Sequence, residues 1–381
     1  MRSRESAQKA ARVRGCAAAV PILLAACSAS QPPVVIREPV PFVAETGADE
    51  DWSADRVRDR ARRLVHQAER HRVEELDRRS LTHRSLWEHL GPVVDSAAGT
   101  TRMEIGRSVE GRTLYAVDFG HGPVRVVLWS QMHGDEPTAT LALADLIRYV
   151  VENADDPLVA RLHERLTVVA IPMLNPDGAQ RGRRENARGI DVNRDARRQV
   201  TPEARALAGV HARLSPHFGF NLHDQAPRVG EDGRSVAISL LAPPHEPNRS
   251  DMPTRTRAKL LAAVMRVAAD SLVDGRVTRY DDAFNGQAFG DAMQSWGTST
   301  VLVETGSWEG DADKEYLRQV NFVLLLVALD AIATGSFEHA DVHEYDSLPG
   351  NRANNGTKPG AGAGPLAVRG TGPAPARTRV P

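Results

Sequence analysis

Residues 124–137 read VRVVLWSQMHGDEP, and this stretch indicates how the chain folds. Its first six residues are apolar except for Arg125, which is typical of a strand in the interior of a sheet. Polar residues and a turn signal follow directly, so we expect the strand to end there. The spacing therefore predicts that His133 and Glu136 project from the mouth of a buried strand toward a common point.

An imidazole and a carboxylate at this spacing are suitable as two zinc ligands, but a zinc site needs a third. The same His-x-x-Glu spacing recurs at residues 66–69 and 71–74. Both of those lie in a charged stretch with helical character, and we interpret them as solvated pairs on a helix. The strand-end setting distinguishes the pair at residues 133–136.

The composition is that of an ordinary globular protein. The chain has 381 residues, of which 41% are hydrophobic, enough for one large domain or two small ones with a sizeable core. Its formal net charge is -1, and it has no long basic patch interleaved with aromatic residues. We therefore expect no nucleic-acid partner.

The N-terminus has the layout of a bacterial export signal. Several basic residues fall within residues 1–15, and the apolar segment at 16–26 is too short to span a bilayer. It runs into Leu-Ala-Ala-Cys, which looks like a lipobox, so we expect residues 1–26 to be removed and Cys27 to carry lipid. The protein would then be exported and anchored to the periplasmic or cell-surface side of a bacterial membrane. The alternative is ordinary cleavage after Ser30, with Cys27 incidental.

The two cysteines do not contribute to the folded domain in this interpretation. Cys16 lies in the segment that is removed, and Cys27 is blocked by lipid. The mature chain then offers no thiol for a disulfide or a thiolate metal site. Any zinc must be held by His, Asp or Glu.

Composition also sets the expected domain boundaries. Residues 27–51, rich in Pro, Val and acidic residues, predict a tether, and residues 51–79 predict a charged surface helix. Residues 341–381 become dominated by Gly, Pro, Ala and Asn, and we expect a disordered tail there. The folded catalytic unit is therefore expected over residues 52–340.

Strand-like and helix-like segments alternate within that unit. This alternation predicts an α/β fold with a mostly parallel or mixed central sheet and helices on both faces. The apolar run at 322–329 is bounded by Asn321 and Asp330, so we expect it in a core-facing helix rather than a membrane span. The expected strands are 113–119, 125–129, 166–173, 218–222, 236–241 and 298–303, and the expected helices are 138–151, 203–214, 254–272 and 314–333.

Further polar groups lie at the ends of these strands, where open α/β sheets bind ligands. His223 follows the strand at 218–222, and Glu304 follows the strand at 298–303. An Asn-Pro-Asp-Gly turn at 175–178 follows another strand. Taken singly, His223 could be a core histidine, and Glu304 could pair with an arginine.

Five motifs in this order resemble those of the zinc carboxypeptidase family of the carboxypeptidase A type, here in a bacterial lipoprotein. They are His-x-x-Glu, Asn-Pro-Asp-Gly, Arg-x-Asn-x-x-Gly-x-Asp-x-Asn-Arg at 184–194, and the strand-terminal His and Glu. The resemblance covers about half of the chain, from Glu104 to Gly306. Within it, GRSVEGR at 106–112 is similar to the segment that opens many bacterial members.

The resemblance implies a role for each matching residue. One zinc ion per chain would have three protein ligands and water in the open fourth position. The implied zinc ligands are His133, Glu136 and His223; Glu304 matches the general base, Arg184 the residue that polarises the scissile carbonyl, and Asn193 and Arg194 the pair that binds the terminal carboxylate of the substrate. From the residues alone, Asn193 could instead close an Asx-turn, and Arg188 could take the role of Arg184.

The sequence also departs from the family's pattern. Asp135 stands where the digestive enzymes carry an arginine between the first His and Glu. Residues 281–286 lack the tyrosine that caps bound substrate in those enzymes, and Tyr280 is near but out of step. The base of the side-chain pocket should lie near residues 290–291. Asp224 could orient the His223 imidazole, or it could be solvated.

We therefore expect an exported, lipid-anchored zinc metallocarboxypeptidase that removes the C-terminal residue of peptides, including peptidoglycan-derived peptides. We expect it to be a monomer. One alternative is a zinc amide hydrolase that acts on N-acyl amino acids with the same ligands. The other is a catalytically silent peptide-binding lipoprotein, although every implied ligand and Glu304 is present.

Overall fold

The computed structural model describes residues 53–350 and 352–353 of the chain. The predicted signal, the lipidation site at Cys27 and the tether lie outside the described residues, as does most of the predicted tail. The predictions made for those segments therefore stay predictions.

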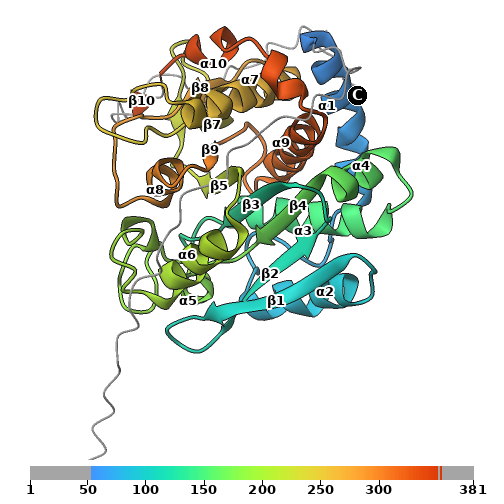
Figure 1. The fold of residues 1–381 in the computed structure, drawn as a ribbon, viewed down its shortest axis with the longest axis vertical. Helices are drawn as coiled ribbons and strands as arrows, with labels where there is room; N and C mark the ends of the chain where they lie inside the picture. The colour runs from blue at the N-terminus through green and yellow to red at the C-terminus, as the bar shows by residue number, and fades with distance from the viewer. Residues whose placement is uncertain (1–52, 351, 354–381) are drawn as a thin grey trace, which may run out of the picture. The chain divides into compact units, whose positions relative to one another are not determined.

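An eight-stranded mixed sheet forms the centre of the described part (Figure 1). Its middle strands run parallel, and antiparallel pairs lie on both sides of them. The predicted α/β class with a mostly parallel or mixed sheet is confirmed. In spatial order the strands are β1 (Thr100–Arg107), β2 (Thr113–Phe119), β4 (Leu166–Ile171), β3 (Val124–Ser130), β5 (Phe218–Asp224), β9 (Ser299–Thr305), β7 (Ile238–Leu241) and β8 (Val277–Arg279).

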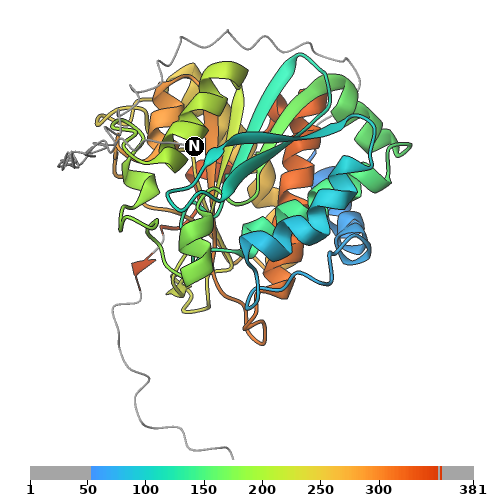
Figure 2. The same ribbon diagram turned by 90° about the horizontal axis from the view of Figure 1, so that it is seen from below.

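Helices cover both faces of this sheet (Figure 2). Alternate residues of β3 enter different cores: Val126 and Leu128 join one apolar cluster, whereas Val127 and Trp129 join the other. The helices are α1 (Ala54–Arg70), α2 (His83–Asp95), α3 (Thr138–Glu152), α4 (Pro157–Arg165), α5 (Pro176–Arg181), α6 (Pro202–Leu214), α7 (Pro253–Val273), α8 (Phe289–Ser295), α9 (Glu315–Thr334) and α10 (His343–Asp346), with short 3-10 turns η1 (Val192–Arg194) and η2 (Ser336–His339). The first cluster draws on α1–α4, α7 and α9, and the second on α6 and α8, so each face has its own helical layer.

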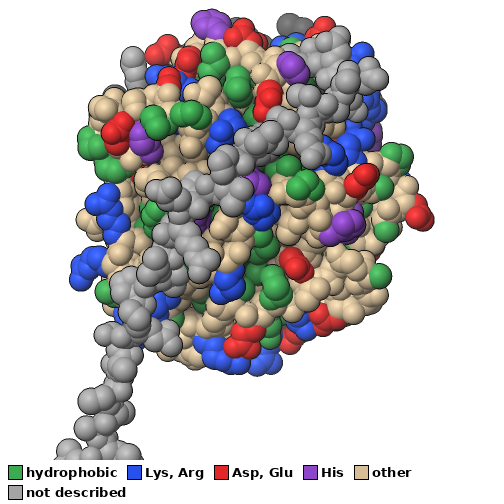
Figure 3. All heavy atoms as spheres, viewed as in Figure 1, with side chains coloured by type: hydrophobic (Ala, Val, Ile, Leu, Met, Phe, Trp, Pro, Cys, Tyr) green, Lys and Arg blue, Asp and Glu red, His purple; other side chains and the backbone are tan. Residues whose placement is uncertain are grey.

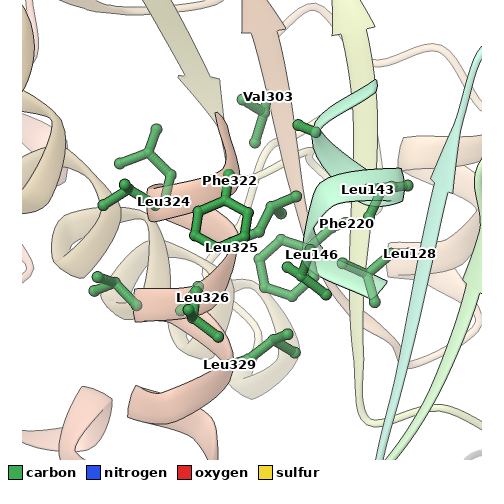
Figure 4. Close-up of a cluster of buried hydrophobic side chains, with 14 of the residues drawn as sticks. Leu128, Leu143, Leu146, Phe220, Val303, Phe322, Leu324, Leu325, Leu326 and Leu329 are labelled. Atoms are coloured by element: carbon green, nitrogen blue, oxygen red, sulfur yellow. The ribbon is translucent and has the colours of Figure 1, made fainter. Parts of the chain in front are cut away.

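Helix α9 is the centre of the larger core. Phe322 and Leu325 of α9 lie beside Phe220 of β5 and Leu146 of α3 (Figure 4). By length and composition α9 is the one described helix that passes as a candidate membrane span, but 89% of its apolar window is buried inside the protein. Burying a Leu or Phe side chain contributes about 1.5–3 kcal/mol each, which accounts for its apolar composition. The predicted core-facing helix is thus confirmed.

The helix predicted over residues 51–79 is too long. Helix α1 ends at Arg70, and the chain continues as a loop in which Leu76 is fully buried. The buried guanidinium of Arg318 donates hydrogen bonds to the carbonyls of Val73 and Leu76. The Leu76 carbonyl is therefore satisfied by a distant residue, and the Val73 carbonyl by Arg318 together with a local bond from the N–H of Leu76.

The tail predicted from residue 341 begins too early. Helix α10 buries Tyr345, whose hydroxyl oxygen accepts a hydrogen bond from the backbone N–H of Ala242. Strand β10 (Arg352–Ala353) pairs antiparallel with β6 (Arg228–Val229). The folded part therefore extends to at least Ala353, because one buried tyrosine anchors a segment whose composition predicts disorder.

Charged and apolar side chains are interspersed on the surface. On the face seen in Figure 3, acidic, basic and histidine side chains alternate, and apolar groups are scattered. Among the described residues, Val200 and Met252 are the exposed large hydrophobic side chains. Large apolar side chains are thus exposed only singly on the described surface.

Candidate metal centre and active site

The backbone conformation of the loop after β3 and the hydrogen bonds within it position the polar side chains of that loop. Gln131 adopts a left-handed conformation with φ of 49°, which turns the chain sharply out of the strand. Its side-chain amide donates to the carbonyl of Gly134 at 2.9 Å, and its carbonyl oxygen accepts from the Thr140 hydroxyl at 2.9 Å. These bonds hold the loop that carries His133 and Glu136 against the start of α3.

The Asn-Pro-Asp-Gly segment is the start of a helix rather than a free turn. Asn175 caps α5 by accepting from the N–H of Gly178, and its amide donates at 3.2 Å to the carbonyls of both Met132 and Arg184. A Cβ on Gly134 would lie 2.0 Å from the Gly178 carbonyl carbon, so the loop can approach α5 only with glycine there. Asn175 therefore links the segment that carries His133 to the one that carries Arg184.

Three side chains converge at the carboxyl ends of β3 and β5. These strands are parallel neighbours, which brings His223 beside the β3 loop. The Nδ1 atom of His133 lies 2.8 Å from Glu136 Oε1, and the Nδ1 atom of His223 lies 2.7 Å from Glu136 Oε2. All ligand atoms of this cluster lie within 4.8 Å of one another, and all three side chains are buried. The structure thus brings together the three predicted metal ligands.

The chemistry of this cluster fits a zinc ion. Burial opposes ionisation of Glu136, but the charges and hydrogen bonds of His223 and His133 outweigh it and lower its pKa below the ordinary value. The Nε2 atom of His133 donates to Asp191 Oδ1 at 3.1 Å, so Nδ1 is the atom turned toward the cluster. Two imidazoles and one carboxylate with a carboxylate behind the histidine form a typical catalytic zinc set. The sequence analysis missed Asp191, although it lies two residues before Asn193 in a motif already singled out.

Arg184 lies at the edge of the cluster. Its Nε donates to Asp191 Oδ2 at 3.0 Å, and its Nη1 lies 3.1 Å from His133 Nδ1. Its side chain is 39% exposed and lines the central cavity. Arg188, the alternative considered from the sequence, is exposed on the outer side of the same loop and does not line that cavity. Arg184, which the motif spacing favours, is therefore the arginine that faces the predicted metal ligands.

Glu304 is the last residue but one of β9 and lies directly beside His223, its partner in the register of β5 and β9. Its side chain is 7% exposed and lines the same cavity. Within the described residues no arginine or lysine forms an ion pair with it, so the pairing alternative does not apply. Burial raises its pKa to about 7, the range in which one carboxyl group can both accept and donate a proton.

A cavity of about 830 Å³ extends from this cluster over β5 and β9. Asn193 and Arg194 line it from η1, and the Asn193 amide oxygen accepts from the N–H of Phe289 in α8. Asp291 of α8 is almost fully buried at its wall, and burial raises the pKa of Asp291 to about 6. Tyr280 also lines the cavity, so its apparent offset in the sequence does not remove it from the site.

Asp224 serves neither of the purposes considered for it. It is buried and accepts hydrogen bonds from Arg78 at 2.6 Å and from the Thr138 hydroxyl at 2.8 Å, while Lys314 Nζ lies 3.5 Å away. Lys314 also donates to the carbonyl of Thr305, next to Glu304. Asp224 therefore joins the ends of α3, β5 and β9 instead of orienting an imidazole.

Comparison with known sequences agrees with this geometry. Residues 95–213 match the family described as zinc carboxypeptidase. Carboxypeptidase SOL1 of Arabidopsis thaliana is 30% identical over 136 residues, which cover 34% of this chain and 28% of that protein. Carboxypeptidase D of Rattus norvegicus is 28% identical over 145 residues, covering 33% of this chain and 10% of that protein. The chain thus spans less than a third of the length of either relative.

Solved structures share the fold over a larger part of the chain. A metallo-carboxypeptidase from Burkholderia cenocepacia superposes with a TM-score of 0.51 at 19% identity, covering 65% of this chain and 69% of that chain. Bovine thrombin-activatable fibrinolysis inhibitor superposes with a TM-score of 0.52 at 15% identity, covering 70% and 99%. The protein therefore has the metallo-carboxypeptidase fold, and residues 95–213 within it match the zinc carboxypeptidase family.

Proposed function

We propose that this protein is a zinc-dependent metallocarboxypeptidase that hydrolyses the C-terminal peptide bond of peptides. The observation that carries the proposal is the convergence of His133, Glu136 and His223 in one cavity with Glu304. The matches to carboxypeptidases support a peptidase-type hydrolase, and the cavity geometry supplies the parts that such chemistry needs.

The two histidines and Glu136 would hold the zinc ion. When bound, zinc would supply Lewis-acid chemistry and lower the pKa of water to about 7. Glu304 would take the proton from the attacking water and later give it to the leaving amine. Its raised pKa suits both steps, because it lies near neutral pH.

Cationic and amide groups in the cavity would position the substrate. Arg184 would donate an N–H to the scissile carbonyl oxygen as negative charge develops there. Asn193 and Arg194 would bind the terminal carboxylate, for which a guanidinium fork is geometrically suited. The scissile peptide bond would then lie between Arg184 on one side and Asn193 and Arg194 on the other, next to Glu304.

Asp291 would determine which C-terminal side chains the proposed pocket prefers. Its carboxylate lines the cavity close to Arg194 and has no ion-pair partner among the described residues. An unpaired buried carboxylate is stabilised when a cation reaches it. We therefore propose a preference for substrates whose C-terminal residue carries an amine or a guanidinium.

A peptide library provides the first test. Protein comprising residues 28 onward would be incubated with mixed peptides, with and without a chelator, alongside the Glu304→Gln variant. We expect removal of single C-terminal residues that stops with chelator and with the variant. N-acyl amino acids in the same assay distinguish an amide hydrolase. Peptides left intact by zinc-loaded protein would contradict the proposal.

A further inference from the structure

A second group of cations lines the cavity away from Arg194. Arg228 of β6 and Arg279 at the end of β8 both contribute to its wall. Within the described part of the chain, neither guanidinium has a carboxylate within ion-pair distance, whereas Arg184 is paired with Asp191. Half-buried guanidinium groups without a carboxylate partner in the protein are available to bind an anionic group of a ligand.

Arg228 packs beside Tyr280 in the wall of the cavity. Its guanidinium carbon is 5.6 Å from the centre of the Tyr280 ring, and its Nε is buried without a hydrogen-bond partner. Burial and then the nearby Glu304 carboxylate raise the pKa of Tyr280, while Arg228 opposes that shift. Tyr280 thus has Arg228 as one neighbour and the proposed general base as another.

Backbone pairing connects Arg279 and Arg228 to one segment of the chain. Arg279 is bridged to Gly350, and Arg228 pairs with Ala353 of β10. Residues 350–353 span at most about 10 Å when extended. One Nη of Arg279 donates to the carbonyl of Asp346, which leaves its other N–H groups for a ligand. Both arginines therefore flank the same short segment, and both line the cavity.

Neighbouring acidic residues do not neutralise this pair. Asp282 lies within ion-pair distance of Arg249 and Arg255. Asp281 is exposed and accepts the N–H of Ala283, and Asp291 lies near Arg194. Within the described part of the chain, none of these three carboxylates forms an ion pair with Arg228 or Arg279.

We propose that Arg228 and Arg279 form an anion-binding subsite for an acidic side chain on the amino-terminal side of the scissile bond. This inference rests on the proposed function, because Arg194 and Asp291 then take the terminal carboxylate and the last side chain. The preceding residues would then run along the wall that Tyr280 and Arg228 form. A Glu or Asp side chain there meets a guanidinium fork that matches a carboxylate.

Two short N-acylated peptides test the subsite. They share the same C-terminal residue and differ only by Glu or Gln in the residues before the scissile bond, so that shape is kept and charge is lost. For zinc-loaded wild-type protein we expect kcat/KM to be about tenfold higher for the Glu peptide at low salt. Added salt should lower that ratio.

Substitutions of the two arginines test whether they cause the preference for the Glu peptide. Arg228→Gln and Arg279→Gln should each bring the Glu/Gln ratio close to one, with little change in kcat/KM for the Gln peptide. Arg228→Lys should keep part of the preference, since it keeps the charge but loses the fork. Arg276→Gln is the matched control, because Arg276 is near in sequence but pairs with Glu309 outside this cavity.

Binding separates this inference from the proposed catalysis. Calorimetry with zinc-loaded Glu304→Gln protein should show tighter binding of the Glu peptide, and the Arg228→Gln exchange should abolish the difference. If wild-type protein cleaves neither peptide but binds the Glu peptide more tightly, the proposed catalysis fails and the subsite stands. Equal binding of the two peptides, or a preference that both arginine variants keep, would overturn the subsite.

Discussion

Glu304 occupies a strand position that would ordinarily carry an aliphatic side chain, since the rest of β9 is buried. A carboxyl group there is destabilised by desolvation, which raises its pKa to about 7. Positions that conflict with local packing in this way are expected at functional sites. At the residue scale, the site is therefore recognised by buried carboxyl groups that form no ion pair with an arginine or lysine among the described residues, namely Glu304 and Asp291.

The Glu304→Gln exchange should lower kcat by about 10²–10⁴-fold, because the proton acceptor is lost while the shape is kept. Zinc content, measured by atomic emission, should be unchanged. Glu110→Gln, at an exposed ion pair, is the control. Loss of zinc together with activity would instead identify Glu304 as a ligand.

The Asp291→Asn exchange should lower kcat/KM for peptides ending in Lys by about tenfold relative to peptides ending in Leu, since the buried anion is removed. The ratio of the two rate constants is the measurement. The exposed Asp281→Asn exchange should leave that ratio unchanged. An unaltered ratio in Asp291→Asn protein would show that the C-terminal side chain does not reach Asp291.

At the scale of elements, regular segments were predictable and irregular ones were not. Strand β3 and helix α3 have one dominant periodicity, and their positions follow from it. The loop after α1 depends on Arg318, and the position of Tyr280 depends on how residues 281–288 fold over the cavity. Such contacts join residues that are distant in sequence, so local sequence patterns do not predict them. The ligand residues were predictable because ordered motifs, and not periodicity, located them.

Helix α6 leads to a prediction about pH. His211 of α6 is buried against Trp296, with Nε2 3.0 Å from the Thr298 hydroxyl, and burial lowers the pKa of His211 to about 4. In the unfolded chain histidine takes up a proton near pH 6.5. The stability that the neutral, buried imidazole contributes to the folded state is therefore lost as pH falls from about 6.5 to 4. Within that window we expect the free energy of unfolding to fall by up to about 1.4 kcal/mol per pH unit from this residue. Urea unfolding of wild-type and His211→Gln protein should show a shallower pH dependence in the variant; identical slopes would contradict it.

At the scale of the whole molecule, the strand ends that carry the predicted metal ligands belong to one continuous sheet, so the proposed metal binding would be coupled to folding. Residues 133–136 and His223 come from neighbouring strands, and only the folded state brings them together. A metal that binds the folded state alone raises its stability by mass action.

Zinc at one hundred times its dissociation constant should therefore stabilise the protein by about 2.7 kcal/mol. Thermal melting with zinc and with chelator measures the effect as a shift in Tm. The His223→Ala variant should show little shift. Equal melting temperatures of wild-type protein in both conditions would argue against a metal site.

Anchoring through Cys27 is also a property of the whole molecule, and we propose it from the N-terminal sequence. In a bacterial host, the wild-type chain should sediment with membranes and partition into detergent. Cys27→Ser protein should not be lipidated, because it lacks the thiol, and Cys16→Ser is the control. Soluble wild-type protein that begins after Ser30 would favour ordinary cleavage.

The contacts of Arg318 also determine when the site becomes complete. Arg318 donates to the carbonyl of Leu76, 242 residues earlier in the chain, and Arg78 in the same loop donates to Asp224 beside His223. During synthesis, which begins at the N-terminus, the contacts of Arg318 with that loop cannot form until α9 has emerged. Closing so long a loop is slow. The nascent chain therefore spends most of its synthesis without a finished site, and the proposed proteolytic activity would be delayed until the last long helix docks.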